Sequence, residues 1–427
     1  MWLSKRSLLI YVALFLVAVV AANVILFNAL PKPPRVEQPL SLAYTTADPP
    51  FERSLNALLM QPVVGGNQLE FLRDGEEIYP AMIDAINSAQ HSITFETYEF
   101  WGENSARPLV EALARAAERG VQVHAVMDYI GSTQADQEKF ERMDEAGVDW
   151  VRWREPRWYL LARFNHRTHR KLLVVDGQIG FIGGANIADA WLPVDGRTAY
   201  RDYHFRVEGP VVAQLQAAFA ETWLDAVGVY LEGDAYFPEL PAVGETSAQV
   251  VNSAPREGRH RIRKLFLYAL AAAEEQVTAS TAYFYPDADF LDAITAAAER
   301  GVKVRILVPG ESIDQGYLRH ASVNRWGPML EAGVEIYEYQ PSMFHAKLIS
   351  IDDRWASIGS ANLDNRSFRI NDEANLNVYD SDFAIELRMV IEEELEQAKL
   401  YDVERWENRS WYRKVYGWVG MIIGAYL

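Results

Sequence analysis

The chain has 427 residues, of which 49% are hydrophobic and 23% are charged, a balance typical of globular α/β proteins that bury large cores. Its 41 basic and 59 acidic residues give a formal net charge of −18, which repels nucleic acid at long range and argues against a nuclease. The chain contains no cysteine, so disulfides and thiolate metal sites are excluded.

The N-terminal segment predicts a membrane anchor. Leu8–Phe27 is apolar apart from one asparagine, and it is long enough to cross a hydrocarbon core of about 30 Å as one helix. We therefore expect residues 1–30 to form a single-pass membrane anchor; a cleaved signal peptide is the alternative. Lys5 and Arg6 precede the apolar run and favour a cytoplasmic N-terminus, with the remainder of the chain on the other side of the membrane. A proline-containing linker is predicted at 31–67.

Two copies of one pattern follow, predicted as lobes at 68–231 and 249–400 with a linker at 232–248. The sequence Ala-Ala-Glu-Arg-Gly-Val starts at Ala116 and again at Ala297. Each copy is expected to run helix, strand, helix, strand and then a short buried strand. In the first lobe the first four elements are predicted at Tyr79–Ala89, Ser92–Tyr98, Ala106–Arg119 and Val121–Met127. In the second lobe they are predicted at Leu265–Glu275, Val277–Tyr283, Ala288–Arg300 and Val302–Val308.

The short buried strands, Leu172–Val175 and Leu348–Ile351, lie inside two copies of the motif H-x-K-x4-D-x6-G-(G/S)-x-N. The chemistry-bearing residues of the first copy are His169, Lys171, Asp176 and Asn186. Those of the second copy are His345, Lys347, Asp352 and Asn362. Because residues two apart on a strand share a face, each lobe presents one imidazole beside one ammonium. This pair suits a phosphodiester, since imidazole can attack phosphorus or move a proton and the ammonium stabilises the developing oxyanion.

A third polar element closes each copy. Arg201–Val207 alternates as a strand, and Asp372–Val378 can be aligned with it so that Asp202 lies opposite Glu373. A carboxylate against the far nitrogen of a histidine fixes its tautomer and stabilises its cationic form. A salt bridge at the end of a strand is the alternative interpretation.

The motifs resemble those of the phospholipase D superfamily, and Asn165–Gly177, Ile182–Asn186 and Tyr200–Pro210 are most similar to bacterial cardiolipin synthases. The resemblance implies an α/β fold of two repeated lobes, each a mixed β-sheet flanked by helices, related by a pseudo-twofold axis and sharing one active site. It also implies that His169 is the nucleophile, although the symmetry of the motifs leaves His345 as an alternative. The residues predicted to be catalytic are His169, Lys171, Asp176, His345, Lys347 and Asp352. Those predicted to bind phosphate or to orient the histidines are Asn186, Asn362, Asp202 and Glu373.

The predicted reaction is phosphatidyl transfer between phospholipids through a phosphohistidine. Its favoured outcome is cardiolipin from two phosphatidylglycerols, with release of glycerol. Hydrolysis to phosphatidic acid is the runner-up, and a nuclease or a catalytically dead lipid-binding protein ranks below it. The lysines supply the positive charge, so no metal and no cofactor is expected. Phospholipids and the membrane are the expected partners, nucleic acid is not, and the oligomeric state stays open.

Two aromatic segments remain. Residues 401–427 form a C-terminal tail that mixes aromatic and basic side chains, as at a bilayer interface, or that packs as a helix on the second lobe. A second group of aromatic and apolar residues precedes the first motif. We expect this group either to pack in the core or, together with Met343 and Phe344, to form the wall of a lipid entrance. That group consists of Trp153, Trp158, Tyr159, Leu160 and Leu161.

Overall fold

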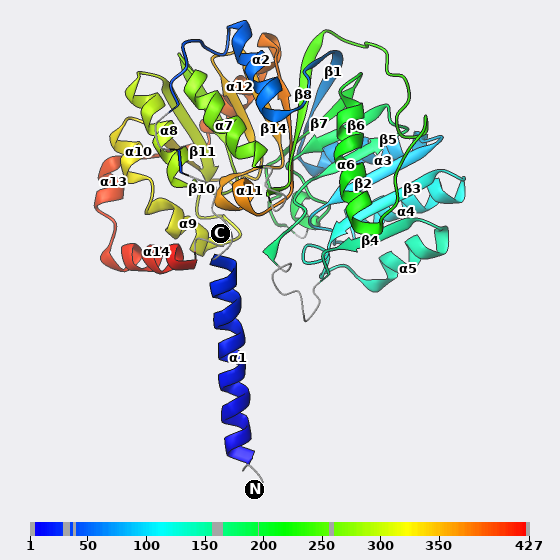
Figure 1. Ribbon diagram of the computed structural model, residues 1–427, viewed down its shortest axis with the longest axis horizontal. Coiled ribbons are helices and arrows are strands. Elements are labelled where there is room, and N and C mark those ends of the chain that lie inside the picture. Colours follow the sequence, from blue (N-terminus) through cyan, green and yellow to red (C-terminus); the bar gives the residue numbers. More distant parts are fainter. Residues whose placement is uncertain are drawn as a thin grey trace.

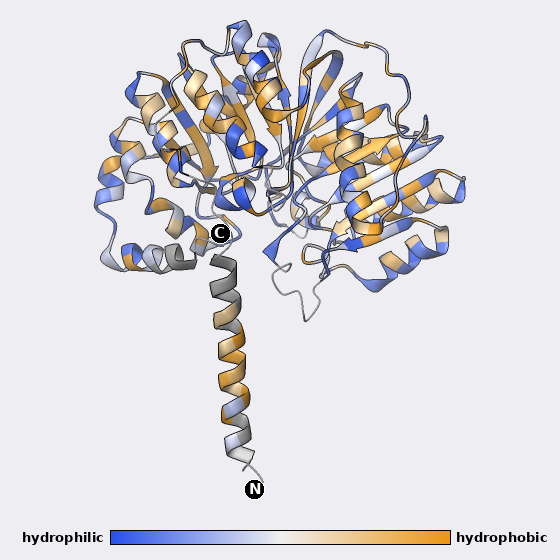
Figure 2. Ribbon diagram, in the orientation of Figure 1, coloured by the Kyte–Doolittle hydropathy of each residue, from blue (hydrophilic) through white to orange (hydrophobic). Residues whose placement is uncertain are grey.

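The computed structural model describes residues 5–28, 35–36, 40–155, 165–194, 196–255 and 260–423. Two lobes lie side by side, and helix α1 (Lys5–Asn28) projects away from them (Figure 1). Figure 2 shows that much of α1 is hydrophobic. Over the residues that are described, no helix has both the length and the apolar character needed to cross a membrane. The transmembrane role of residues 1–30 therefore stays a prediction.

The first lobe is a mixed sheet in which three strands are parallel and four are antiparallel. The parallel strands are β2 (Ser92–Thr97), β3 (Gln122–Asp128) and β4 (Asp149–Trp153). The antiparallel strands are β5 (Leu172–Val175), β6 (Ile179–Gly183), β7 (Tyr203–Glu208) and β1 (Val64–Arg73). The helices are α3 (Asp74–Ser88), α4 (Ala106–Glu118), α5 (Gln137–Ala146) and α6 (Val212–Val227).

The second lobe repeats this plan and adds one edge strand. Its parallel strands are β9 (Gln276–Ser280), β11 (Lys303–Pro309) and β12 (Glu335–Tyr339). Its antiparallel strands are β13 (Leu348–Ile351), β14 (Trp355–Gly359), β16 (Glu373–Val378), β8 (Thr246–Ser253) and the edge strand β17 (Ala398–Tyr401). Its longer helices are α7 (Arg261–Ala272), α8 (Ala288–Glu299), α9 (Gly316–Val323), α12 (Ser381–Leu395) and α14 (Trp411–Ile423).

The two lobes join through antiparallel pairing of β1 with β8 into one 15-stranded sheet. From this junction outward the first lobe runs β1-β7-β6-β5-β2-β3-β4, and the second runs β8-β16-β14-β13-β9-β11-β12-β17. Apart from the edge strand β17, each strand thus has a counterpart at the same distance from the junction, as a pseudo-twofold axis requires. The predicted fold class is confirmed.

The motif strand β5 is buried on both faces, which explains its uninterrupted apolar sequence. Leu173 and Val175 pack in the core of the first lobe, while Leu172 and Val174 pack in the core between the lobes. Strand β13 is buried in the same way, with Ser350 in the place of Val174, and both strands have the bounds predicted from the sequence.

The linker predicted at 31–67 is wrong in part, because it contains α2 (Pro49–Leu59) and the start of β1. Phe51, Leu55 and Leu59 recur every four residues and are buried in the core of the second lobe. The prolines do not prevent this helix, because they stand in its first turn, where the backbone N–H has no helical partner. The second linker, predicted at 232–248, likewise ends early, where β8 begins.

Candidate active site

The two motif histidines are brought together by backbone contacts between the lobes. The N–H of His169 donates to the carbonyl of Asp372 at 2.9 Å, and the N–H of His345 donates to the carbonyl of Arg201 at 2.8 Å. The backbone N–H of each histidine is therefore bonded to a segment of the other lobe. That segment carries the carboxylate that is predicted to orient the histidine. Both imidazoles are buried, with 7% and 6% of their surface exposed.

Each histidine contacts a carboxylate from the opposite lobe. His169 Nδ1 lies 3.0 Å from both carboxylate oxygens of Glu373, and His345 Nδ1 lies 2.8 Å from Asp202 Oδ2. Donation of Nδ1–H to the carboxylate leaves Nε2 as the free nitrogen of each ring. The sequence predicted such contacts, but it did not predict that they cross between the lobes. Their catalytic role stays a prediction.

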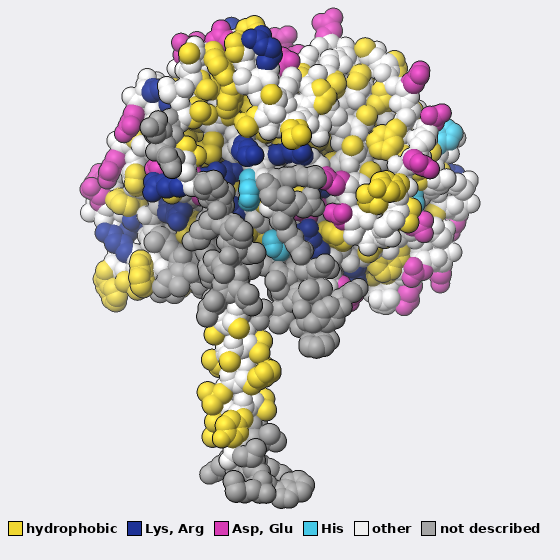
Figure 3. All heavy atoms as spheres, in the orientation of Figure 1, with side chains coloured by type: hydrophobic (Ala, Val, Ile, Leu, Met, Phe, Trp, Pro, Cys, Tyr) yellow, Lys and Arg dark blue, Asp and Glu magenta, His cyan; other side chains and the backbone are white. Residues whose placement is uncertain are grey.

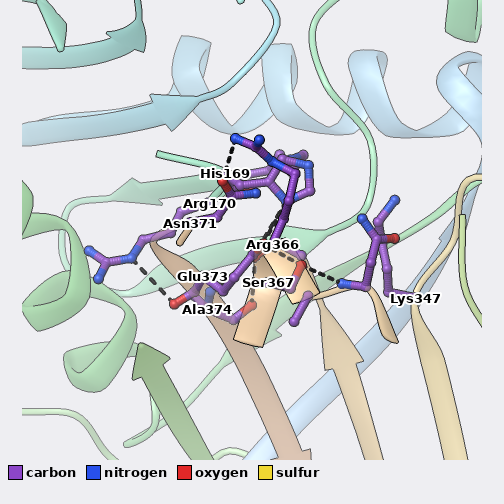
Figure 4. A network of polar contacts seen from close by, with 12 residues as sticks. His169, Arg170, Lys347, Arg366, Ser367, Asn371, Glu373 and Ala374 are labelled. Atoms are coloured by element: carbon purple, nitrogen blue, oxygen red, sulfur yellow. Dashed lines mark hydrogen bonds and ion pairs between the residues drawn. The ribbon is translucent and has the colours of Figure 1, made fainter. Parts of the chain in front are cut away.

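The carboxylates are themselves held by neutral donors. Glu373 accepts bonds from Ser360 Oγ at 2.5 Å and from Ser367 Oγ at 2.7 Å, and Figure 4 shows Ser367, Glu373 and His169 in one network. Asp202 accepts a bond from Trp191 Nε1 at 2.9 Å. Both orienting groups are therefore fixed before any substrate binds.

The motif lysines share this buried site. Lys171 Nζ donates to the carbonyl of His169 at 2.6 Å, and Lys347 Nζ lies 3.2 Å from His345 Nε2. Burial lowers the pKa of Lys171 to about 7 and that of Lys347 to about 8. Burial, and then the lysine charges, lower the pKa of His345 to about 3 and that of His169 well below its usual value. Both imidazoles are therefore neutral at pH 7, as a nucleophile or a general base must be.

Asn186 and Asn362 follow β6 and β14 and are both buried. Asn186 Oδ1 accepts from the N–H of Glu99 at 3.2 Å, and Asn362 Oδ1 accepts from Thr281 Oγ1 at 3.4 Å. Each amide oxygen is thus bonded within its own lobe. The NH₂ group of each amide therefore points away from that bond, and an NH₂ group is the kind of donor that a phosphate oxygen needs. Phosphate binding by these residues stays a prediction.

The placement of Asp176 and Asp352 points to a structural role, and their assignment as catalytic residues stays a prediction. Each ends its motif strand, about 20 Å of extended chain from the histidine, and has a left-handed φ of 52° and 54° respectively. Asp176 accepts bonds from the backbone N–H groups of Gln90, His91 and Ser92. Asp352 accepts equivalent bonds from Glu274, Glu275 and Gln276. These aspartates fix the motif hairpin to the start of β2 or β9, which supports a structural role.

A buried charged network behind His169 has no equivalent in the second lobe, and the sequence patterns did not reveal it. Arg170 donates to Thr222 Oγ1 at 2.6 Å and to the carbonyl of Glu373 at 3.4 Å (Figure 4). Glu96 accepts from Thr222 Oγ1 at 3.2 Å, and burial raises its pKa to about 7. At the corresponding positions of the second lobe stand Ala346 and Ser280. Comparing the two motifs at these positions is the sequence signal that would have identified the network.

Aromatic rings also line the histidines, and these too were missed. Tyr98 contacts His169 edge-on with ring centroids 5.5 Å apart, and Trp191 contacts His345 edge-on at 5.0 Å. Tyr200 stacks on His345 at 6.4 Å. These rings exclude water from the imidazoles, which contributes to their lowered pKa values.

The predicted lipid entrance is corrected in part. Phe344 belongs to the core between the lobes, Met343 is also buried, and Trp153 packs against a small core beneath α6. These residues therefore do not form an open wall. The remainder of the predicted entrance, Trp158, Tyr159, Leu160 and Leu161, lies outside the described residues.

Comparison with known proteins gives consistent matches in sequence. The family model described as "Cardiolipin synthase, PLD-like domain" matches residues 82–223 and 266–395. Cardiolipin synthase 1 of Staphylococcus epidermidis is 32% identical over 347 residues, which cover 80% of this chain and 71% of that protein. Cardiolipin synthase 2 of Bacillus anthracis is 32% identical over 348 residues, which cover 81% of this chain and 68% of that protein.

Solved structures show the fold at lower identity. A phosphatidylserine synthase from Haemophilus influenzae aligns with a TM-score of 0.70 and 14% identity, over 88% of this chain and all of that one. A polyphosphate kinase from Porphyromonas gingivalis aligns with a TM-score of 0.52 and 15% identity, over 88% of this chain and 54% of that one. Both comparisons concern the fold alone.

Proposed function

Because the chain belongs to the cardiolipin synthase, PLD-like domain family, we propose that it transfers a phosphatidyl group between two phosphatidylglycerols, forming cardiolipin and releasing glycerol. The observation that carries this proposal is the crossed pair of histidine–carboxylate contacts, 3.0 Å and 2.8 Å long, at one site shared by both lobes. A double displacement at phosphorus requires two oriented imidazoles, one that is neutral and attacks phosphorus and one that carries a proton to and from the alcohols.

In the proposed first step, His169 Nε2 attacks the phosphorus of one phosphatidylglycerol. The bond from phosphorus to the glycerol oxygen breaks, and His345, which the bound anionic phosphodiester keeps protonated at Nε2, donates that proton to the oxygen, so glycerol leaves. In the second step His345 removes the proton from the headgroup hydroxyl of another phosphatidylglycerol. That oxygen attacks phosphorus and releases His169 unchanged. Lys171 and Lys347 offset the charge that develops on the phosphate oxygens.

A nitrophenyl phosphodiester separates the roles of the two histidines. Its leaving group needs no protonation, so His345→Ala should still release about one nitrophenolate per enzyme as His169 becomes modified, and then stall. His169→Ala should release none. The reverse result would assign the nucleophile to His345.

Product identity tests the reaction itself. Purified, detergent-solubilised protein is incubated with phosphatidylglycerol labelled in its glycerol headgroup, and the lipid and water-soluble products are resolved. Cardiolipin with an equal amount of free glycerol supports the transferase. Mainly phosphatidic acid would replace the transferase with the hydrolase, because water would then be the acceptor. Activity should survive exhaustive chelation, since lysines stand where a metal-dependent site would need carboxylates.

For the location we propose a bacterial inner membrane, with α1 as a single-pass anchor and both lobes in the periplasm. The support is the apolar sequence of α1 and the position of Lys5 and Arg6 before it. Protease added to spheroplasts should then digest the lobes. Their survival until the membrane is lysed would place them in the cytoplasm.

A further inference from the structure

The last helix exposes a concentrated aromatic surface. Outside α1, no helix in the described ranges exposes as many large hydrophobic side chains as α14. Scattered exposed hydrophobic residues are normal on a soluble surface, whereas a contiguous group marks an interaction site. The exposed group, named here the α14 face, consists of Trp411 (77% exposed), Tyr412 (57%), Val415 (52%), Tyr416 (53%) and Trp418 (60%).

The opposite side of α14 is fixed to the second lobe, so its aromatic side chains are presented outward from an anchored helix. Gly417 is buried against α9, where an added Cβ would lie 2.5 Å from the carbonyl oxygen of His320. Asn324 Nδ2 donates to the carbonyl of Lys414 at 3.1 Å, and its Oδ1 accepts from Arg409 at 2.9 Å. One side of α14 therefore packs on the second lobe, as one interpretation of the tail predicted. The other side exposes aromatic side chains, as the other interpretation predicted.

The α14 face lies on the active-site edge of the sheet. Strand β13 runs antiparallel to β9. Its first residue, Leu348, comes three positions after His345 and pairs with Ser280 at the carboxyl end of β9. Helix α9 follows the carboxyl end of β11, the parallel neighbour of β9, and α14 packs on α9. Figure 1 shows α14 on the side of the second lobe from which α1 projects. Figure 3 shows histidine, lysine and arginine side chains gathered between the lobes on the side from which α1 projects.

We propose that the α14 face lies in the headgroup layer of a phospholipid bilayer and holds the active-site edge of the sheet against the membrane. The inference rests on the proposed function, because it supplies the route by which a lipid reaches the histidines. Tryptophan and tyrosine suit this layer, since each combines an apolar ring with a polar group. Arg413 and Lys414 on the same helix match anionic phosphatidylglycerol headgroups, whereas the chain as a whole, at −18, would be repelled by them.

The cysteine-free sequence allows a direct test. Tyr412→Cys or Trp418→Cys is introduced into the full chain and spin-labelled, and the protein is reconstituted into phosphatidylglycerol vesicles. Collision of the label with oxygen is compared with collision with a water-soluble nickel chelate. Met60→Cys is the matched control, because Met60 is 77% exposed at the end of α2, away from α14 (Figure 1). Labels on α14 should favour oxygen and the control should favour nickel. An α14 label as accessible to nickel as the control would overturn the proposal, and shielding from both reagents would indicate a protein partner instead.

A second measurement separates this inference from the proposed function. Trp411→Ser combined with Trp418→Ser should lower cardiolipin formation from vesicles about tenfold, equivalent to about 1.4 kcal/mol. Turnover of phosphatidylglycerol dissolved in detergent micelles should not change, because micelles need no docking. If the wild type forms cardiolipin and the variant loses nothing on vesicles, the docking role fails while the transferase stands. If the wild type forms none, the transferase itself fails.

Discussion

Replacing Glu373 by glutamine tests whether the crossed carboxylate contributes to turnover. The substitution keeps the size of the side chain but exchanges one oxygen for an NH₂ donor. Both oxygens of Glu373 are engaged by groups that donate, namely His169 Nδ1 at 3.0 Å, Ser360 Oγ at 2.5 Å and Ser367 Oγ at 2.7 Å. The new NH₂ group must therefore face at least one other donor.

The loss of activity follows from what the carboxylate does for the ring. It holds the proton on Nδ1 and leaves Nε2 free to attack, and it stabilises the positive charge that the ring gains in the phosphohistidine. In serine proteases, exchanging the equivalent aspartate for asparagine leaves the wrong tautomer and lowers kcat about 10⁴-fold. We expect Glu373→Gln to lower kcat about 10²- to 10⁴-fold, which corresponds to about 2.7 to 5.4 kcal/mol.

The assay is cardiolipin formation from phosphatidylglycerol in mixed micelles, with circular dichroism to confirm the fold. Glu338→Gln is the matched control, because Glu338 is also buried in the second lobe but pairs with Arg319 rather than a histidine. The control should lose stability and keep its kcat. A well-folded Glu373→Gln variant with kcat within threefold of the wild type would refute the orienting role.

Three further outcomes follow from the structure. Because the ammonium forms of Lys171 and Lys347 exist below pKa values of about 7 and 8, kcat/KM should fall as pH rises above 7, and Lys171→Arg should move this alkaline limb upward. Asp176→Asn should lower the melting temperature, by weakening bonds worth about 1.5 to 3 kcal/mol each, while kcat measured well below melting stays unchanged. Arg170→Met should destabilise the fold by about 3 to 5 kcal/mol, because Glu96 is left buried without its cation, and adding Glu96→Gln should restore most of the melting temperature.

The repeated motifs predicted the fold because its repeated strands and helices are encoded in local sequence, and they also predicted the histidines and lysines that the structure places at one site. Strand β5 is apolar throughout, and β13 is apolar apart from Ser350, since both of their faces are buried, so their bounds could be predicted directly. The role of Asp176 could not be read in this way. Its fixed spacing from His169 suggested that both residues act in the reaction. The spacing instead reflects the constant length of β5, which follows His169 and ends at an aspartate that accepts backbone hydrogen bonds from the start of β2.

The pairing of each histidine with its carboxylate could not be predicted for a different reason. Asp202 and Glu373 are equivalent in sequence, and each could have served its own lobe. Only the β1–β8 junction decides that they cross. Helix α2 was missed because the linker indicated by Pro31, Pro33 and Pro34 was extended to residue 67, although the prolines of α2 itself stand in its first turn and do not interrupt it.

The crossing makes each lobe incomplete, because neither contains both a histidine and the carboxylate that orients it. The asymmetry around the crossed contacts then supports different roles for the two histidines. Glu373 is held by two serine hydroxyls, and its backbone carbonyl is held by Arg170, whereas Asp202 has Trp191 as its side-chain donor. A nucleophile must return to one fixed position in every cycle, while an acid–base group must serve two alcohols in turn. The more rigidly supported ring is His169, which favours it as the nucleophile and His345 as the proton carrier.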